Sequence, residues 1–165
     1  MPPKALGIEQ ILTILAEGPP RLAEFTIGLT TAQLHATPGP GEWSANEVLA
    51  HLRACADVWG NCIAAITNQD RPTIRAVNPR TWIQGTDYPE QEFRSSLQAF
   101  TAQRTALLAV LESLSPEDWS RSAVVTGAGK PLERSVHSYA QWMAEHERPH
   151  VKQIKRIAAT MRNQQ

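Results

Sequence analysis

Apolar residues recur along most of this chain at alternating steps of three and four positions, which is the spacing of one face of an α-helix. No run alternates with a period of two for long enough to predict a strand. The pattern therefore predicts an all-α protein with four long helical segments. We expect them over residues 7–28, from Ser44 to near Thr67, from around Pro89 to Leu114, and from near Pro131 to Met161.

Local signals at the helix ends refine this prediction. The stretch WSANEV predicts a firm start for the second segment, because Ser44 can cap the helix and Glu47 can complete a capping box. Pro89 is a favoured first-turn residue for the third segment. Pro19 and Pro20 are expected to break or kink the first segment, since neither can donate a backbone hydrogen bond.

Length and composition indicate one domain over residues 1–165, because the chain can bury one full core but is too short for two ordinary domains. Lys plus Arg and Asp plus Glu both number 16. With no net field, we expect no nucleic-acid partner. No window predicts a membrane span or a cleaved leader, so we expect a cytoplasmic protein.

The stretch HERPH fits the H-E-x-x-H pattern of zinc peptidases. His146 and His150 lie about 6 Å apart along a helix and on one face, so both imidazoles can reach one ion. A peptidase of this kind needs a third ligand, usually downstream, yet residues 151–165 contain no His, Asp or Glu. Pro149 is a further objection, because it removes a backbone bond between the two histidines and bends the helix. These observations disfavour a peptidase.

The best upstream donor is His51, which lies close to the apolar face of the second segment. It falls early in that segment, whereas His146 and His150 fall ten or more residues before the end of the fourth. The three side chains lie nearer to one level if these two helices are antiparallel than if they are parallel. This favours a four-helix bundle with up-down-down-up topology, in which the breaker-rich residues 68–88 form a long crossover between the second and third helices.

These residues resemble the DinB/YfiT-like superfamily, whose members are small four-helix bundles with a histidine triad. GEWSANEVLAHL and HERPHVKQI carry the resemblance, and their order and separation match along nearly the whole chain. The resemblance implies that His51, His146 and His150 bind a divalent ion such as zinc or nickel. It also implies a homodimer and an enzyme that acts on a small-molecule substrate, with a low-molecular-weight thiol as cosubstrate.

Three neutral imidazoles with an open fourth position are typical of a catalytic metal site. A thiol entering that position would become a nucleophilic thiolate, and the resemblance implies thiol S-transferase chemistry of this kind. Activation of a bound water would instead make the protein a metal-dependent hydrolase. A third alternative is a non-catalytic bundle that binds a metal or ligand and dimerises.

Other residues carry weaker signals. Glu147 is a candidate base, although a solvated surface glutamate is the simpler interpretation. Arg104 interrupts an apolar face, where it can anchor a substrate carboxylate or extend to the end of the bundle. Cys55, one turn after His51, can approach the ion or serve as a small buried apolar residue. Trp82 and Tyr88 are expected to line the mouth of the site or to pack over the helix ends.

The remaining histidines and the second cysteine have simpler interpretations. His35 and His137 are expected to be ordinary polar residues. Cys62 lies seven positions after Cys55 on one helix, so their Cα atoms are about 10 Å apart and beyond disulfide reach.

Overall fold

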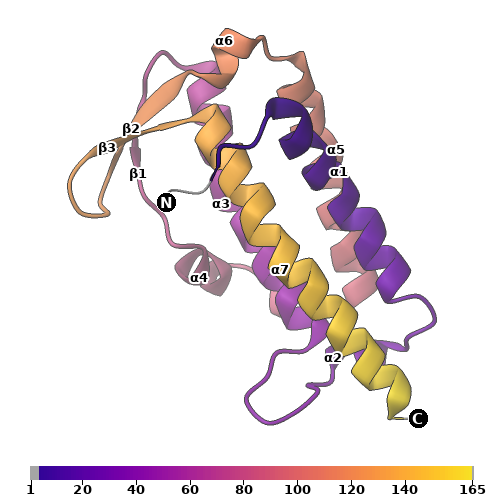
Figure 1. Cartoon of the computed structure of the whole chain (residues 1–165). Helices are drawn as coiled ribbons and strands as arrows, with labels where there is room; N and C mark the ends of the chain where they lie inside the picture. The colour runs from indigo at the N-terminus through magenta and orange to yellow at the C-terminus, as the bar shows by residue number, and fades with distance from the viewer. Residues whose placement is uncertain (1–3, 165) are drawn as a thin grey trace.

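The computed structural model describes residues 4–164 and shows an elongated bundle of four long helices (Figure 1). Short helices and three strands connect them. The helices, including the 3₁₀ turns η1 and η2, are α1 (Ile8–Phe25), α2 (Thr31–His35), α3 (Ala45–Asn68), α4 (Pro79–Trp82), η1 (Ile83–Gly85), η2 (Tyr88–Glu90), α5 (Phe93–Ser113), α6 (Pro116–Trp119) and α7 (Val136–Asn163). The strands are β1 (Thr73–Arg75), β2 (Ser122–Thr126) and β3 (Leu132–Ser135).

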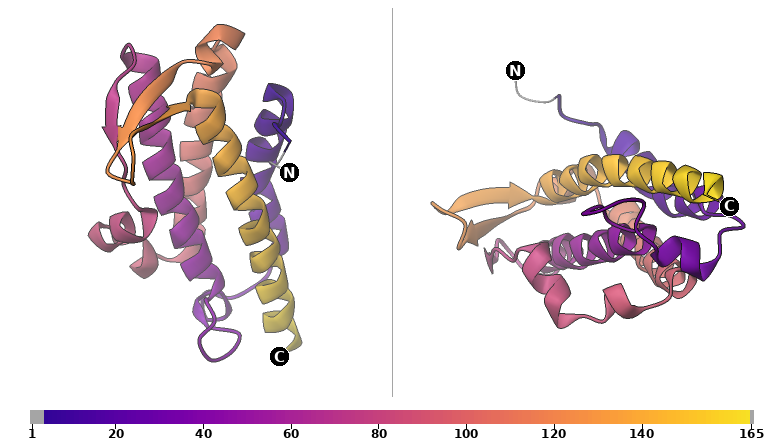
Figure 2. Two further views of the ribbon diagram at one scale, coloured as in Figure 1. Left: turned by 60° about the vertical axis from the view of Figure 1, so that its left-hand side comes forward. Right: turned by 90° about the horizontal axis from the view of Figure 1, so that it is seen from below.

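The predicted topology is confirmed. In Figure 1, α1 and α7 run downward, whereas α3 and α5 run upward. Each long helix packs against two others, in the cyclic order α1, α7, α3, α5. The view from below in Figure 2 (right) shows α1 and α7 in one layer and α3 and α5 in the other. The crossover from α3 to α5 passes along the outside of the second layer, which lets these two helices run in the same direction.

The start of α3 agrees with the predicted Ser44 cap, but among the described residues the Glu47 side chain makes no return bond to Ser44 N–H, so the predicted capping box is incomplete. The Ser44 side chain accepts a hydrogen bond of 3.1 Å from the backbone N–H of Glu47. Two further capped turns lie between long helices. Thr30 caps α2 and Ser115 caps α6, and the backbone N–H of each cap residue donates in return to the side chain of the third helix residue.

Two predicted helix starts are wrong. Helix α5 begins at Phe93 rather than near Pro89, because Glu92 provides the cap by accepting from Ser95 N–H, while Pro89 lies in the preceding 3₁₀ turn. Helix α7 begins at Val136 rather than near Pro131, since residues 132–135 form a strand.

The small sheet was not predicted. Strand β2 pairs in parallel with β1 and antiparallel with β3, which gives the order β1-β2-β3 at one end of the bundle. Within β2, only Ala123 and Val125 are buried. Three to five residues are too few for a clear alternation, and these strands are stabilised by partners distant in the sequence.

Of the break or kink predicted in the first helix, the break is wrong, because α1 continues through Pro19 and Pro20. Pro19 cannot donate to the carbonyl of Leu15, four residues earlier, yet Leu15 is fully buried. The guanidinium of Arg104 replaces the missing donor, with Nη1 2.7 Å from Leu15 O. Pro20 likewise cannot donate to the carbonyl of Ala16, but Ala16 is exposed to solvent.

The core consists of two apolar clusters that succeed each other along the bundle. One contains Leu15 of α1 and Ala144 of α7, and the other begins at Leu22 and Val151 of the same helices. Between these limits lies a level, here called the waist, where polar side chains enter the bundle. No helix among residues 4–164 is both long and apolar enough to cross a membrane.

Candidate metal centre

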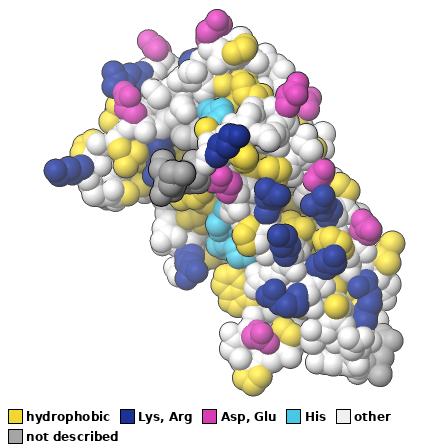
Figure 3. All heavy atoms as spheres, in the orientation of Figure 1, with side chains coloured by type: hydrophobic (Ala, Val, Ile, Leu, Met, Phe, Trp, Pro, Cys, Tyr) yellow, Lys and Arg dark blue, Asp and Glu magenta, His cyan; other side chains and the backbone are white. Residues whose placement is uncertain are grey.

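Helices α3 and α7 bring the three predicted histidines together at the waist. The ring centroids of His51 and His146 are 5.2 Å apart, those of His51 and His150 4.9 Å, and those of His146 and His150 4.7 Å. The Nε2 atoms of His51 and His146 approach to 3.4 Å. His51 is only 8% exposed, whereas the other two are half-buried. Figure 3 shows histidine side chains at the molecular surface.

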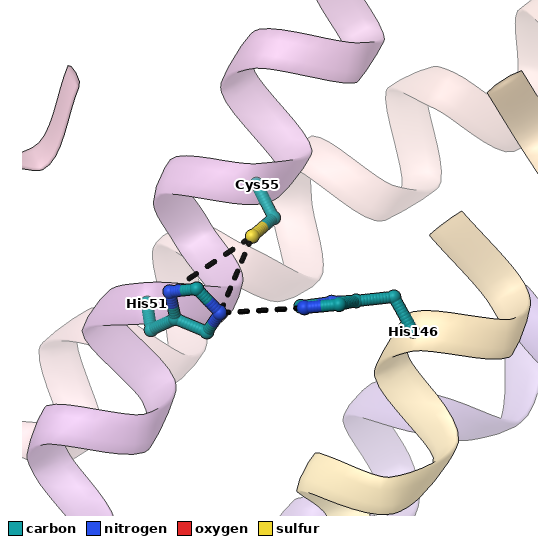
Figure 4. A group of neighbouring side chains, drawn as sticks. All are labelled: His51, Cys55 and His146. Atoms are coloured by element: carbon teal, nitrogen blue, oxygen red, sulfur yellow. Dashed lines mark hydrogen bonds between the residues drawn. The ribbon is translucent and has the colours of Figure 1, made fainter. Parts of the chain in front are cut away.

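A sulfur atom joins this group. Cys55, one turn after His51 on α3, places Sγ 3.6 Å from His51 Nε2. One donor atom each from His51, Cys55 and His146 lies within 4.8 Å of the others (Figure 4). His150 is outside this tightest group, although its ring is adjacent to both imidazoles.

A hydrogen-bond partner at Nδ1 of His150 leaves Nε2 of the same ring available to a ligand. Its Nδ1 lies 2.9 Å from the side-chain oxygen of Gln153. A bond from Nδ1–H to this oxygen leaves the lone pair on Nε2, which is the tautomer that a metal ligand needs. Helix α7 continues through Pro149, so the proline between the histidines does not separate them. Glu145, whose carbonyl Pro149 leaves unpaired, is on the exposed side of α7.

Burial keeps these donors uncharged. It lowers the pKa of His51 to about 4, with further lowering by the charges of His150, His146 and Arg80. Burial, followed by the charge of His150, also lowers the pKa of His146 to about 4. Desolvation raises the pKa of Cys55 to about 12. At neutral pH the two imidazoles are therefore neutral and able to donate a lone pair.

The donor set fits a divalent ion of the zinc type. Imidazole nitrogen and thiolate sulfur are the ligands that zinc and nickel accept readily. The buried Nδ1 of His146 has no hydrogen-bond partner among the described residues. Its Nε2 lies 3.4 Å from His51 Nε2, where the two rings can share at most one hydrogen bond.

Two tryptophans limit access to the histidines. Trp43 stacks on His150 with a centroid distance of 6.5 Å and an interplanar angle of 15°. Trp59 meets His146 edge to face at 5.1 Å. These contacts hold two rings from outside and cover part of their surface. Neither tryptophan was predicted to contact the site.

A cavity of about 290 Å³ opens beside His51. Side chains of α3 and of the crossover line it, together with the residue before the α3 cap. They are Trp43, Glu47, Ala50, His51, Arg80, Ile83 and Pro89. The cavity therefore combines apolar walls with one cationic and one anionic side chain. Arg80 was not predicted, because its neighbours come from a distant helix.

Trp82 and Tyr88 are not in this lining. Both donate hydrogen bonds to Asp57 Oδ2, at 3.0 Å from Trp82 Nε1 and 2.6 Å from the Tyr88 hydroxyl. The Tyr88 ring also lies under the guanidinium of Arg53, 3.7 Å from its centroid. These contacts fasten the crossover to α3 and so position the cavity wall.

The expectations for Glu147 as a surface residue and for Arg104 as a side chain extending to the bundle end are wrong. Their side chains are only 4% and 3% exposed and form a two-pronged ion pair, with N–O distances of 2.8 and 2.9 Å. Glu147 is buried because α7 packs on α1 as well as on α3. Arg104 binds Glu147 and Leu15 O rather than extending to solvent.

The two remaining histidines make ordinary polar contacts. His35 Nε2 accepts a hydrogen bond of 3.2 Å from Phe93 N–H. His137 Nε2 lies 2.8 Å from Leu6 O.

The sequence model of the DinB superfamily matches residues 14–154, a range that includes all three clustered histidines. The chain belongs to the DinB superfamily. No curated protein matches the sequence significantly.

Solved structures show the same DinB-type fold. YfiT from Bacillus subtilis is described as a probable metal-dependent hydrolase with an unusual four-helix bundle topology. It aligns with a TM-score of 0.80 at 17% identity, over 98% of this chain and 93% of YfiT. The mycothiol-dependent maleylpyruvate isomerase aligns with a TM-score of 0.63 at 17% identity, over 90% of this chain and 61% of the isomerase. At this identity the likeness establishes the fold.

Proposed function

We propose that this protein is a metal-dependent enzyme that transfers a low-molecular-weight thiol to a small electrophilic substrate. The proposed ligands are His51, His146 and His150, and the proposed ion is zinc or nickel. The observation that carries the proposal is the meeting of three imidazoles from α3 and α7, with ring centroids 4.7, 4.9 and 5.2 Å apart, beside a cavity of about 290 Å³.

The residues around the cavity have separate roles in this proposal. When bound, the ion supplies the positive charge that favours a thiolate over a thiol at neutral pH. Trp43 and Trp59 hold His150 and His146 in place. Arg80 lines the cavity and its charge lowers the pKa of His51, so it is close enough to attract a substrate carboxylate.

The buried ion pair favours thiol chemistry over hydrolysis. Hydrolysis benefits from a carboxylate that accepts a proton from the attacking water. Glu147 follows His146 directly, but Arg104 engages both of its carboxylate oxygens. A thiol needs less help, because its proton leaves more easily than that of water.

The hydrolase alternative has one observation in its favour. Glu47 lines the same cavity as His51 and is exposed, so it can serve as a base for water. The likeness to YfiT, described as a probable metal-dependent hydrolase, agrees with this alternative. In that case Glu47 rather than Glu147 would be the catalytic carboxylate.

Turnover assays on zinc-loaded and nickel-loaded protein distinguish these functions. We expect conjugation of monochlorobimane by at least one member of a panel of cellular thiols, dependent on the ion and lost in His150→Ala. Thiol-independent hydrolysis of activated esters, lost in Glu47→Gln, would support the hydrolase instead. Absence of both activities in ion-loaded protein would contradict an enzymatic function and favour the non-catalytic bundle.

A further inference from the structure

The donor atoms at the waist come from two pairs with the same spacing. His51 and Cys55 are four residues apart on α3, and His146 and His150 are four residues apart on α7. Side chains at this spacing lie one above the other on the same helix face. Because α3 and α7 are neighbours and antiparallel, the two pairs face each other. Figure 4 shows Cys55 Sγ directed toward the His51 ring, which itself points to His146.

The second cysteine provides an internal comparison. Cys62 lies on the same helix, seven residues later, and its thiol contacts the Tyr139 hydroxyl rather than an imidazole. It lines a different, small cavity with Trp59 and Tyr139. Cys55 is only 3% exposed, and its sulfur is 3.6 Å from one His51 nitrogen and 4.0 Å from the other. Cys62 is half-buried, and it shows that a thiol on this helix can lie beside a partner other than an imidazole.

We propose that Cys55 is a fourth protein ligand of the ion and that, in the resting protein, it occupies the position that an external thiol takes during turnover. The ligand role rests on the ion site of the proposed function, and the exchange role rests also on its thiol chemistry. Sγ already lies within the group of donors that approach one another to 4.8 Å, so no helix has to move for it to reach an ion shared with His51 and His146.

The exchange is balanced in protons and charge. The incoming thiol loses its proton as its sulfur binds, and Cys55 leaves as a thiolate that takes up this proton. One thiolate replaces another, so no oxidant or reductant is needed and the charge of the site is unchanged.

X-ray absorption at the zinc edge tests the ligand role on the full chain. In the wild type we expect one sulfur at about 2.3 Å beside nitrogen at about 2.0–2.1 Å. The sulfur should persist in Cys62→Ala and disappear in Cys55→Ala. The wild-type spectrum is decisive even if Cys55→Ala fails to fold.

Other results of the X-ray absorption measurement would contradict either the role of Cys55 or the ion site itself. Zinc bound by nitrogen and oxygen alone would overturn the role of Cys55 and leave the histidine site intact. Sulfur that persists in Cys55→Ala or disappears in Cys62→Ala would also overturn it. Absence of bound zinc in the wild type would overturn the ion site and this inference together.

The exchange role has its own readout. Removing an internal competitor should lower the apparent Kd of zinc-loaded Cys55→Ala for an external thiol by about tenfold, which corresponds to about 1.4 kcal/mol. Cysteine serves as the probe, and Cys62→Ala should bind it as the wild type does. An unchanged Kd in Cys55→Ala, with zinc–sulfur contact in the wild type, would show a permanent ligand and overturn the exchange.

Discussion

Two groups of polar side chains enter the bundle at the waist, and they differ in how far the protein satisfies them. On the side of α1 and α5, Arg104 bonds to both oxygens of Glu147 and to Leu15 O. On the side of α3, the His146 ring has a buried nitrogen with no partner among the described residues and a second nitrogen 3.4 Å from that of His51.

The difference separates a structural group from a binding group. Buried polar atoms are destabilising unless they are paired, so both groups need partners. The arginine finds its partners within the chain, partly because Pro19 leaves a carbonyl free. His51, His146 and Cys55 have mainly one another as polar neighbours, with their nearest side-chain atoms 3.4 to 3.6 Å apart. A cation bound by the lone pairs of these side chains is the partner that the proposed function gives them.

Breaking the ion pair should have the largest effect on stability. In Arg104→Met, Glu147 becomes an unpaired buried charge, and we expect the free energy of unfolding to fall by about 3–5 kcal/mol. Urea denaturation of metal-free protein measures this. Replacing Glu147 by Met as well should restore much of the loss. A metal-free His146→Leu variant destabilised as much as Arg104→Met would remove the distinction between the groups.

Ion binding should have the next largest effect, confined to the histidine group. Zinc at about 100-fold its Kd should raise the free energy of unfolding by about 2.7 kcal/mol, because it binds the native state. Thermal unfolding with increasing zinc provides the measurement. The gain should disappear in His51→Ala and persist in His137→Ala, whose imidazole lies elsewhere on α7. Equal gains in both variants would contradict the proposed ligands.

A substitution of Gly18 tests the fit around the ion pair. A Cβ at this position would lie 2.8 Å from Glu147 Oε2, so Gly18→Ala should be destabilising by about 1–3 kcal/mol. A Cβ at Gly60, inside α3, would meet no atom within 4 Å, and Gly60→Ala should be stabilising by about 0.5–1 kcal/mol. Chemical denaturation compares the two variants. A neutral Gly18→Ala would show that the ion pair tolerates displacement.

Lowering the pH should reduce the stability of the metal-free protein through His51 and His146. The pKa of His51 and that of His146 are about 4 in the native state, against an ordinary value of 6.5. The unfolded chain therefore takes up protons that the native state excludes, and stability should fall as pH decreases from about 6.5 to about 4. Urea midpoints of metal-free protein across this range should be less pH-dependent in a His51→Leu/His146→Leu variant. An unchanged pH dependence would contradict neutral native imidazoles.

The helices were predictable wherever local signals suffice. The apolar periodicity located four long helices, and the cap at Ser44 follows from two residues three positions apart. The starts at Phe93 and Val136 were not predicted, because Glu92 is an unusual cap and β3 takes its partner from β2. Strand pairing and the rescue of Leu15 O by Arg104 depend on residues far apart in the sequence.

The site was predictable to a similar extent. Helical spacing placed His146 and His150 on one face, and the level of His51 favoured antiparallel helices. Glu147 lies about 100° around α7 from His146, and this side is solvated only if α7 has a single partner. Since α7 also packs on α1, the side is buried. Arg80 enters through the crossover, whose path has no local signal.

Metal content of protein expressed without a histidine tag and purified without a nickel column tests the central claim most directly. Inductively coupled plasma mass spectrometry should find about one zinc or nickel ion per chain in the wild type, as expected for a site with three or four protein ligands. It should find little or none in folded His51→Ala and His150→Ala. A wild-type protein that contains no divalent ion and binds none on dialysis against zinc or nickel would contradict the claim.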